Sequence, residues 1–469
     1  MTIKTYQDLL AVGQDEARRT EFILSAIADH KSSDLYKTAV DAELYYRHMN
    51  PTIMHLQKVI FNAAGKAVSD IWAANNKVPS RMYFYFIVQS VQFLLGNGVS
   101  FRGEETKQKL GKDFDRNLCR LAIYAMNGGV AYGFWNFEKL EIFPVGAVGS
   151  EPVFIPLVDE ENGALRAGIR YWQIASNKPL RCTLYEEDGY TDYIREKGKE
   201  MSVMTPKRDY IQIERRSEAT GTEIFNGGNY PGFPIIPLFN VNHQSEIVGN
   251  RNTLDAYDLM ASALVNNVDD GNLIYWVLKN CGGMDAEDDE RFIEQLKLTH
   301  VVHADGDGEG ASVDAHTVEA PFQANEAALE RLRSQLFDDF MALDVKNIAG
   351  GAATATQIKA AYEPLNSKAD LFEGQVTEFI ESLLELIGID DTPTYTRSLI
   401  VNQQEQIQNL VTANEYLSRE YITRKILEIL GDTDKAEEVI GQLLAEEVER
   451  FGGVDDDESG DGTSKEEES

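Results

Sequence analysis

A pattern of apolar residues with helical period extends from about residue 355 to residue 388 and predicts one unusually long helix. At 1.5 Å per residue, about 33 residues give a rod of about 50 Å, roughly three times the average helix length. We expect Pro364 to kink this helix near its first turns and Gly388 to end it. The apolar stripe consists of Ile358, Tyr362, Leu365, Ala369, Phe372, Val376, Ile380, Leu383 and Ile387.

Two shorter amphipathic helices are predicted before it, over residues 252–279 and 324–343. In the first helix we expect one face to pack and the opposite, polar face to stay exposed. Its apolar stripe comprises Leu254, Tyr257, Ala261, Leu264, Val268 and Tyr275, and its polar face comprises Asp255, Ser262, Asn266 and Asp269. The stripe of the second helix comprises Leu329, Leu332, Leu336, Phe340 and Leu343.

The remainder of the chain completes a mainly helical α+β fold. Residues before about 135 are predicted to be mainly helical, and residues 132–240 contain short β-like runs separated by turn signals, which predict an inserted strand-rich module. Helical spacing in the first part is seen at Phe22, Ile23 and Ile27 and again at Leu56, Val59 and Ile60. Further helices are expected at 403–417, 418–430 and 433–450, with Gly431 ending the second of them.

The charge of the chain limits what it can bind. With 44 Lys and Arg against 77 Asp and Glu, the formal net charge is −33, whereas tight DNA binding depends on cations that release counterions from phosphates. The charge therefore argues against a tight, general DNA binder. It does not argue against a channel through which DNA slides, because a wall that repels phosphate prevents sticking over a screening length of about 8–10 Å.

The sequence also indicates the cellular compartment in which the protein is expected. Cys119, Cys182 and Cys281 are widely spaced and form no CxxC pair, so reduced thiols are expected. The start of the chain lacks a basic and then apolar signal layout, and the most apolar stretch, residues 83–96, is too short and too polar to cross a bilayer. The protein is expected to stay in a cytoplasm or to enter a particle assembled there.

Signatures of enzymes and metal sites are weak or absent. GxxxxGK[ST], GxSxG and HExxH motifs do not occur. Residues 305–310, DGDGEG, resemble half of a calcium loop, but the twelfth position is His316 and not Glu, so a glycine-rich surface hairpin is favoured. His300 and His303 lack a third placed zinc ligand, and the acidic run 285–290 is more typical of a solvated face than of a nuclease site. We expect no cofactor and no metal.

Residues 344–356 connect two strongly patterned helices through small residues. From chemistry alone an ordinary helix connection is favoured. A mobile loop that carries one cation, Lys346, could also touch a passing polyanion without holding it, because one charge adds little to phosphate affinity.

The order of these elements resembles the portal proteins of long-tailed double-stranded DNA bacteriophages. The resemblance covers roughly residues 40 to 400, and the ordered set of matching segments is more specific than any one of them. The stronger matches are residues 233–238, 254–258, 266–270, 277–279, 353–359 and 365–370; the weaker ones are 45–46, 93–96, 155–157 and 168–172.

Such a resemblance implies a ring of twelve copies around a DNA channel, and it implies a place for each part. These parts would be a wing (1–251, with the strand-rich module, and 357–400), two stem helices (252–279 and 324–343), a clip (280–323), a tunnel loop (344–356), a helical crown (401–452) and a disordered acidic tail (453–469). The tunnel loop would present Lys346, Asn347, Gly350, Gly351 and Thr354 to the channel. The stem would present Asp255, Ser262, Asn266, Asp269, Glu330 and Arg333.

The resemblance also implies partners and a location. The clip would dock the terminase large subunit during packaging and a head-completion or adaptor protein afterwards. Other partners would be the major capsid and scaffolding proteins, and double-stranded DNA would pass without sequence specificity and without any membrane. The ring would sit at the portal vertex of the virion after assembly in the bacterial cytoplasm, as a structural protein and not an enzyme. The alternatives are another head-tail adaptor or assembly protein, against which the chain length argues, and a metal-dependent nuclease.

Overall fold

The computed structural model describes residues 4–61, 66–69, 73–217, 221–270, 274–279, 312–317, 322–346, 355–398, 403–413, 416–432 and 435–451. Two compact units make up the chain, Met1–Ser398 and Leu399–Ser469. The second unit contains the helices α13 (Gln403–Thr412), α14 (Arg419–Leu430) and α15 (Ala436–Phe451). Gly431 ends α14 in the left-handed conformation, as predicted.

The N-terminal part of the first unit is mainly helical, as expected. Its elements are α1 (Tyr6–Val12), α2 (Glu16–Ser32), α3 (Asp34–Tyr46), α4 (Pro51–Met54), β1 (Val59–Phe61), β2 (Ala67–Ser69), α5 (Met82–Leu95), β3 (Val99–Phe101), α6 (Glu104–Leu110) and α7 (Phe114–Gly128). Helix starts follow the local sequence, since Asp15, Ser33 and Asn50 each accept backbone N–H bonds in the first turn that follows. The helical prediction for Val59 and Ile60 is wrong, because these β-branched residues pair with β2 as a strand.

The predicted strand-rich module consists of antiparallel sheets. Its strands are β4 (Val130–Trp135), β5 (Leu140–Pro144), β6 (Val153–Val158), β7 (Leu165–Trp172), β8 (Leu180–Glu186), β9 (Gly189–Arg195), β10 (Met201–Arg208), β11 (Ile211–Ser217), β12 (Gly221–Gly228) and β13 (Ile235–Phe239). One sheet has the order β10-β9-β8-β7-β6 and a second the order β13-β4-β5, while β11 pairs with β12. The second sheet joins the module to the helices, because α7 packs on β4 and β5 and α12 packs on β13.

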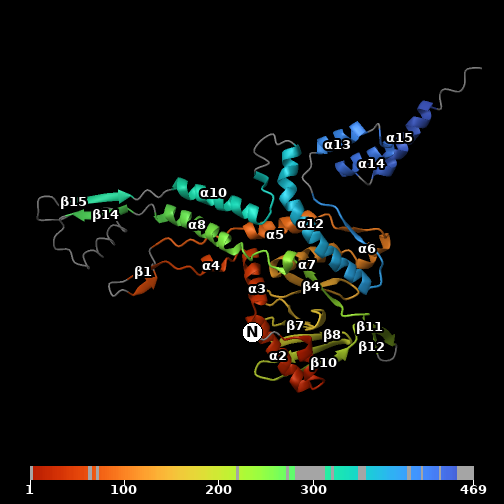
Figure 1. Ribbon diagram of the computed structural model, residues 1–469, viewed down its shortest axis with the longest axis horizontal. Helices are drawn as coiled ribbons and strands as arrows, with labels where there is room; N and C mark the ends of the chain where they lie inside the picture. The colour runs from red at the N-terminus through yellow and green to blue at the C-terminus, as the bar shows by residue number, and fades with distance from the viewer. Residues whose placement is uncertain are drawn as a thin grey trace, which may run out of the picture. The chain divides into compact units, whose positions relative to one another are not determined.

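The long helix α12 (Ala355–Leu386) is confirmed, with Pro364 inside it and Gly388 at φ +72° just beyond its end. It changes direction along its length (Figure 1), and Pro364 lacks the N–H that would continue the ladder there. Its buried stripe, which includes Phe372, Val376 and Phe379, lies in one core with α5, α7 and β4. Gly133 of β4 allows this packing, since a Cβ there would lie 2.6 Å from the ring of Phe379. The strand β16 (Pro393–Tyr395) then pairs with β3.

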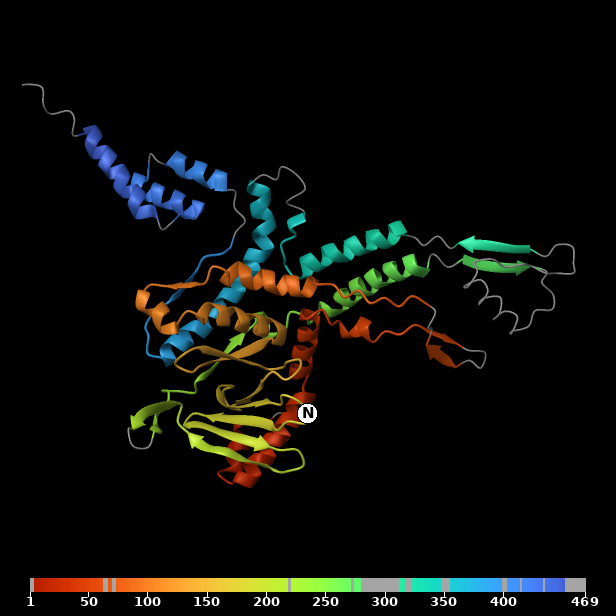
Figure 2. The same ribbon diagram turned by 180° about the vertical axis from the view of Figure 1, so that it is seen from behind.

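Helices α8 (Arg251–Asp270) and α10 (Phe322–Asp339) lie side by side, preceded by the short 3-10 helix η1 (Val241–His243) (Figures 1 and 2). The prediction that the first of these helices continues to residue 279 is wrong. Residues 274–279 form β14 (Ile274–Lys279), which pairs with β15 (Ser312–Thr317). The run Ile-Tyr-Trp-Val-Leu favours a strand through its β-branched and aromatic residues.

A buried histidine links α2 to the strand-rich module. The Nε2 atom of His30 donates to the carbonyl oxygen of Val145 at 2.7 Å, and burial lowers the pKa of His30 below its ordinary value of 6.5. We expect His30→Leu to lower the free energy of unfolding by about 1–3 kcal/mol at neutral pH, because the carbonyl loses its donor.

This penalty should depend on pH in a defined direction. Below pH 6.5 the unfolded chain takes up a proton on His30 that the folded chain resists, so wild-type stability falls and the difference from His30→Leu shrinks. Denaturant unfolding of both chains between pH 5 and 8, with the exposed His55→Leu as control, measures it. A difference that does not change with pH would contradict the assignment.

Candidate functional site

The polar face of α8 is covered by residues 73–80 of the same chain. Ser262 Oγ accepts a bond from the N–H of Val78 at 3.0 Å, and Asn266 Oδ1 accepts one from the N–H of Asn76 at 2.7 Å. Ser262 is 4% exposed and Asn266 is 6% exposed. The expectation that this face stays exposed is therefore wrong for these two residues, because backbone N–H groups of a distant segment take their side chains as partners.

The remaining polar residues of this face are also engaged. Asp269 accepts a bond from Nδ2 of Asn76 at 2.5 Å, and Asp255 accepts bonds from the hydroxyls of Thr52, at 2.9 Å, and Tyr45. Burial, together with the neighbouring Asp255, raises the pKa of Tyr45 to about 12. The polar face of α8 thus binds residues between Tyr45 and Val78 of the same chain.

Asp258 is the buried centre of these contacts and was not predicted from the sequence. Its carboxylate accepts bonds from Nδ2 of Asn50 at 2.8 Å and from the N–H of Ser80 at 3.0 Å. Burial raises its pKa above the ordinary value although both hydrogen bonds oppose the rise. Asn50 is itself only 2% exposed, so the start of α4 and the segment before α5 are both fixed on α8.

Several apolar side chains of α8 are exposed. Leu259 is 47% exposed, Val265 39% and Val268 52%. Val268 was expected on the packed stripe, and this expectation is wrong because the polar side is the covered one. Within a single chain, α8 therefore leaves apolar surface without a partner, which is typical of a contact surface between proteins.

The end of α10 is held by an ion pair. Arg333 makes two bonds to the carboxylate of Asp344, at 2.7 and 2.8 Å, and stacks over Phe337 at 4.7 Å. The side chains of Arg333 and Asp344 are only 13% and 8% exposed, and the guanidinium holds the pKa of Asp344 below its ordinary value. Arg333 is thus engaged within the chain, whereas Glu330, 3.2 Å from it, is 65% exposed.

A second clamp fixes the residue before Asp344. The side-chain amide of Gln89 on α5 accepts from the N–H of Leu343 at 2.9 Å and donates to its carbonyl at 3.0 Å. Leu343 lies in a small core with Phe93, Tyr362 and Leu365. Since Tyr362 and Leu365 belong to the first turns of α12, both ends of the segment between α10 and α12 are anchored on α5.

Lys346 directly follows this anchor. Its N–H donates to Asp344 at 3.1 Å, and the residue is exposed. The other predicted loop residues, Asn347, Gly350, Gly351 and Thr354, lie outside the described residues. The same holds for Cys281, for residues 285–290, for His300 and His303 and for the calcium-like run 305–310.

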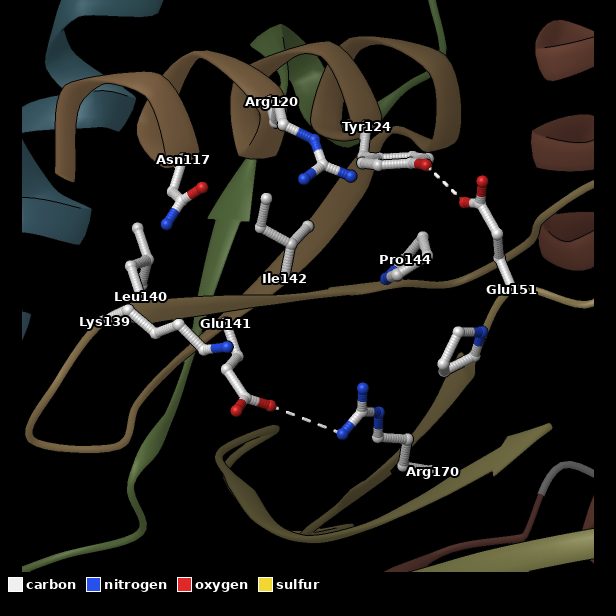
Figure 3. A pocket seen from close by; sticks show the side chains of 11 residues that line it. Asn117, Arg120, Tyr124, Lys139, Leu140, Glu141, Ile142, Pro144, Glu151 and Arg170 are labelled. Atoms are coloured by element: carbon white, nitrogen blue, oxygen red, sulfur yellow. Dashed lines mark hydrogen bonds and ion pairs between the residues drawn. The ribbon is translucent and has the colours of Figure 1, made fainter. Parts of the chain in front are cut away.

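A hollow of about 550 Å³ opens between α7 and β5 (Figure 3). Its lining residues are Asn117, Arg120, Tyr124, Lys139, Leu140, Glu141, Ile142, Pro144, Glu151, Pro152 and Arg170. Arg120, Lys139 and Arg170 all project into it (Figure 3). Glu141 pairs with Arg170 at 3.4 Å and Glu151 with Arg47 at 3.1 Å. This basic lining stands out in a chain of net charge −33, and no pattern in the sequence indicates it.

Other chemistry is sparse in the described part of the chain. No group of three or more His, Cys, Asp or Glu side chains is placed there to hold a metal ion. Burial raises the pKa of the thiol of Cys119 to about 11 and that of Cys182 to about 12. In the same residues, no helix combines the length and the apolar character needed to cross a bilayer.

Comparison with known proteins identifies the family. Residues 27–450 match the family described as phage portal protein, SPP1 Gp6-like. The portal protein of Bacillus phage SPP1 is 24% identical over 94% of this chain and 90% of its own, and that of Clostridium phage phiCD119 is 25% identical over 84% and 86%. A solved chain in the neck of a native GTA particle, computed with C12 symmetry, is 11% identical over 74% of this chain and 90% of its own, with a TM-score of 0.37. The chain belongs to the SPP1 Gp6-like family of phage portal proteins.

Proposed function

We propose that this portal protein assembles into a ring of twelve copies, with a central channel through which double-stranded DNA enters and leaves the capsid. Portal proteins are structural and not enzymatic. The ring would sit at the portal vertex of the virion after assembly in the host cytoplasm. A closed ring requires two different surfaces per copy, and the exposed apolar side chains of α8 supply one surface of the kind that packs against a neighbour.

The parts of the ring are proposed by position. Helices α8 and α10 would form the stem, residues 280–323 the clip, α12 and the residues before 251 the wing, and residues 401–452 the crown. Asp269 and Glu330, which are exposed, remain candidates for the channel wall. Asp255 is held by Thr52 and Tyr45, Ser262 and Asn266 are buried within the chain, and Arg333 is held by Asp344. The large negative charge supports sliding of DNA without adhesion.

The partners are proposed from the parts of the ring assigned above. The terminase large subunit would dock on the clip during packaging, and a head-completion or adaptor protein would replace it afterwards. The major capsid and scaffolding proteins are the other proposed partners.

The observation that carries the channel assignment is the anchoring on both sides of residues 347–354. Gln89 and Arg333 fix the chain up to Asp344, and the packing of Tyr362 and Leu365 fixes the start of α12. Lys346 follows this anchor and is exposed. This position suits a cation that touches passing phosphates at the start of a tunnel loop.

Substitutions in this loop test the channel assignment. We expect Lys346→Glu, and Pro in place of Gly350 or Gly351, to reduce DNA packaging several-fold while rings still form, because the loop acts after assembly and carries one of few cations near the channel. Lys359→Glu, an exposed charge on α12 beyond the loop, is the matched control. Normal packaging by all three loop variants, measured as DNA protected from nuclease in filled heads, would remove the tunnel-loop assignment.

A further inference from the structure

Three cations without an ion-pair partner gather around the hollow beside β5. Lys112, Arg120 and Lys139 are exposed, and none forms an ion pair within the part of the chain that the structure describes. A Cβ atom at Gly111 would lie 3.8 Å from the carbonyl oxygen of Glu138, so the residue before Lys112 lies beside the hairpin that carries Lys139. We call Lys112, Arg120 and Lys139 the basic surface.

The hollow also has apolar residues in its lining and lies at the edge of a sheet. Its lining includes the apolar side chains of Leu140, Ile142, Pro144 and Pro152, beside two carboxylates, Glu141 and Glu151, that pair with Arg170 and Arg47. It also lies at a sheet edge, because β5 is the last strand in the order β13-β4-β5. An occupant should therefore be acidic and should carry an apolar side chain for the apolar part of the lining.

Helix α12 presents such a face. Leu371, Gly374, Glu378, Glu381 and Glu385 recur at three- and four-residue spacing, so they share one side of the helix. Leu371 is 59% exposed and the three glutamates are exposed. None of these glutamates forms an ion pair with a described residue, and α12 carries no Lys or Arg after Lys368. We call Leu371, Glu378, Glu381 and Glu385 the acidic face.

The basic surface and the acidic face lie toward opposite edges of one sheet. Helix α7 packs over β4 and β5, whereas α12 packs over β13 at the other edge. Both helices cover the same face of the sheet, since their side chains share a core with Ala131 and Trp135 of β4. The exposed side of α12 is opposite the stripe that it buries in this core, so the acidic face is directed away from its own basic surface.

We propose that the basic surface of one copy binds the acidic face of α12 of the neighbouring copy, and that this contact closes the portal ring. The inference rests on the proposed ring and specifies its partner surfaces. Leu371 would pack on the apolar part of the lining of the hollow, the missing side chain of Gly374 would allow close approach, and the glutamates would pair with Arg120, Lys139 and Lys112. Two different surfaces at opposite edges are what heterologous, head-to-tail closure requires.

Charge reversal with mixing tests this contact. One variant carries Arg120→Glu with Lys139→Glu, and the other carries Glu378→Lys with Glu381→Lys. Each variant alone should lose rings at concentrations where the unaltered chain assembles, because like charges then face each other across every contact. Mixed in equal amounts, the two variants should regain rings with alternating copies, since every contact again joins opposite charges. Mass photometry and negative-stain microscopy report the rings.

Recovery on mixing also proves that both variants are folded. Control pairs that change exposed charges on the strand-rich module by the same amount, Lys178→Glu with Lys197→Glu and Glu161→Lys with Glu200→Lys, should assemble like the unaltered chain. Rings formed by each reversal variant alone would overturn this interface and leave the portal ring intact. Absence of rings from the unaltered chain, with or without scaffolding protein, would instead overturn the proposed ring itself. Loss of rings without recovery on mixing would count against the pairing of these two surfaces.

Discussion

Lys368→Met should lower the free energy of unfolding by about 3–5 kcal/mol, the range found when one partner of a buried ion pair is removed. Lys368 lies on α12, four residues after Pro364, and its Nζ contacts a carboxylate oxygen of Glu246 at 2.8 Å and the carbonyl oxygen of Phe340 at 3.1 Å. The two charged side chains are only 8% and 13% exposed. Methionine keeps most of the volume, so the loss reports the charge that remains on Glu246.

Double substitution separates charge from packing. Because Glu246 is costly only when its partner is gone, Lys368→Met combined with Glu246→Gln should recover much of the lost stability. Lys359→Met, exposed on the same helix, should change stability by less than about 0.5 kcal/mol. Denaturant unfolding of the four chains gives the comparison. Equal losses from the single and double variants would show that packing of the aliphatic stem, and not the ion pair, dominates.

The position of this pair explains why it matters for a portal. Lys368 joins the long helix to the end of α10, through Phe340, and to the segment that leads into α8, through Glu246. The proposed stem and wing therefore meet at one buried charge. Weakening this ion pair should therefore destabilise the start of α8 and the end of α10 together.

The long helix was predictable because the spacing of its apolar residues lies within one continuous stretch of the sequence. The nine residues of the α12 stripe recur at helical spacing, so burying them in one core requires a long helix. The bounds of α12 and its proline agree with the prediction. Residues 274–279 were misassigned because a run of five apolar and aromatic residues before Lys279 fits a helix face as well as a strand. The β-branched Ile274 and Val277 were the available signal.

Contacts between distant segments could not be read from the pattern. Ser262 and Asn266 bind residues that lie 184 and 190 positions earlier in the chain, so a polar stripe expected to face water is buried instead. Arg120 and Lys139 appear unremarkable in sequence and form one surface only because α7 packs on β5. The tunnel-loop and clip roles remain predictions, since they depend on residues outside the described ranges and on neighbouring copies.

The ion pair at the end of α10 gives the second large effect. We expect Asp344→Ala to cost about 3 kcal/mol, because Arg333 is left 13% exposed with only the exposed Glu330 beside it. It should also reduce packaging, since the N–H of Lys346 loses its acceptor and the start of the loop is released. Asp338→Ala, an exposed acid on the same helix, should change neither stability nor packaging.

Two further measurements separate the roles of Asp344. Asp344→Asn retains an acceptor for Lys346 but not the charge, so it should lose stability like the alanine variant while keeping more of the packaging activity. Arg333 lowers the pKa of Asp344 below 3.8, so the contribution of the pair is fully present above about pH 4 and is lost as pH falls through the lowered pKa. The stability difference between the unaltered chain and Asp344→Ala should therefore be constant from pH 5 to 8 and shrink below pH 4. A stability difference that does not shrink as the pH falls would show that the side chain acts by packing alone. Equal packaging by the asparagine and alanine variants would show that the bond to Lys346 does not position the loop.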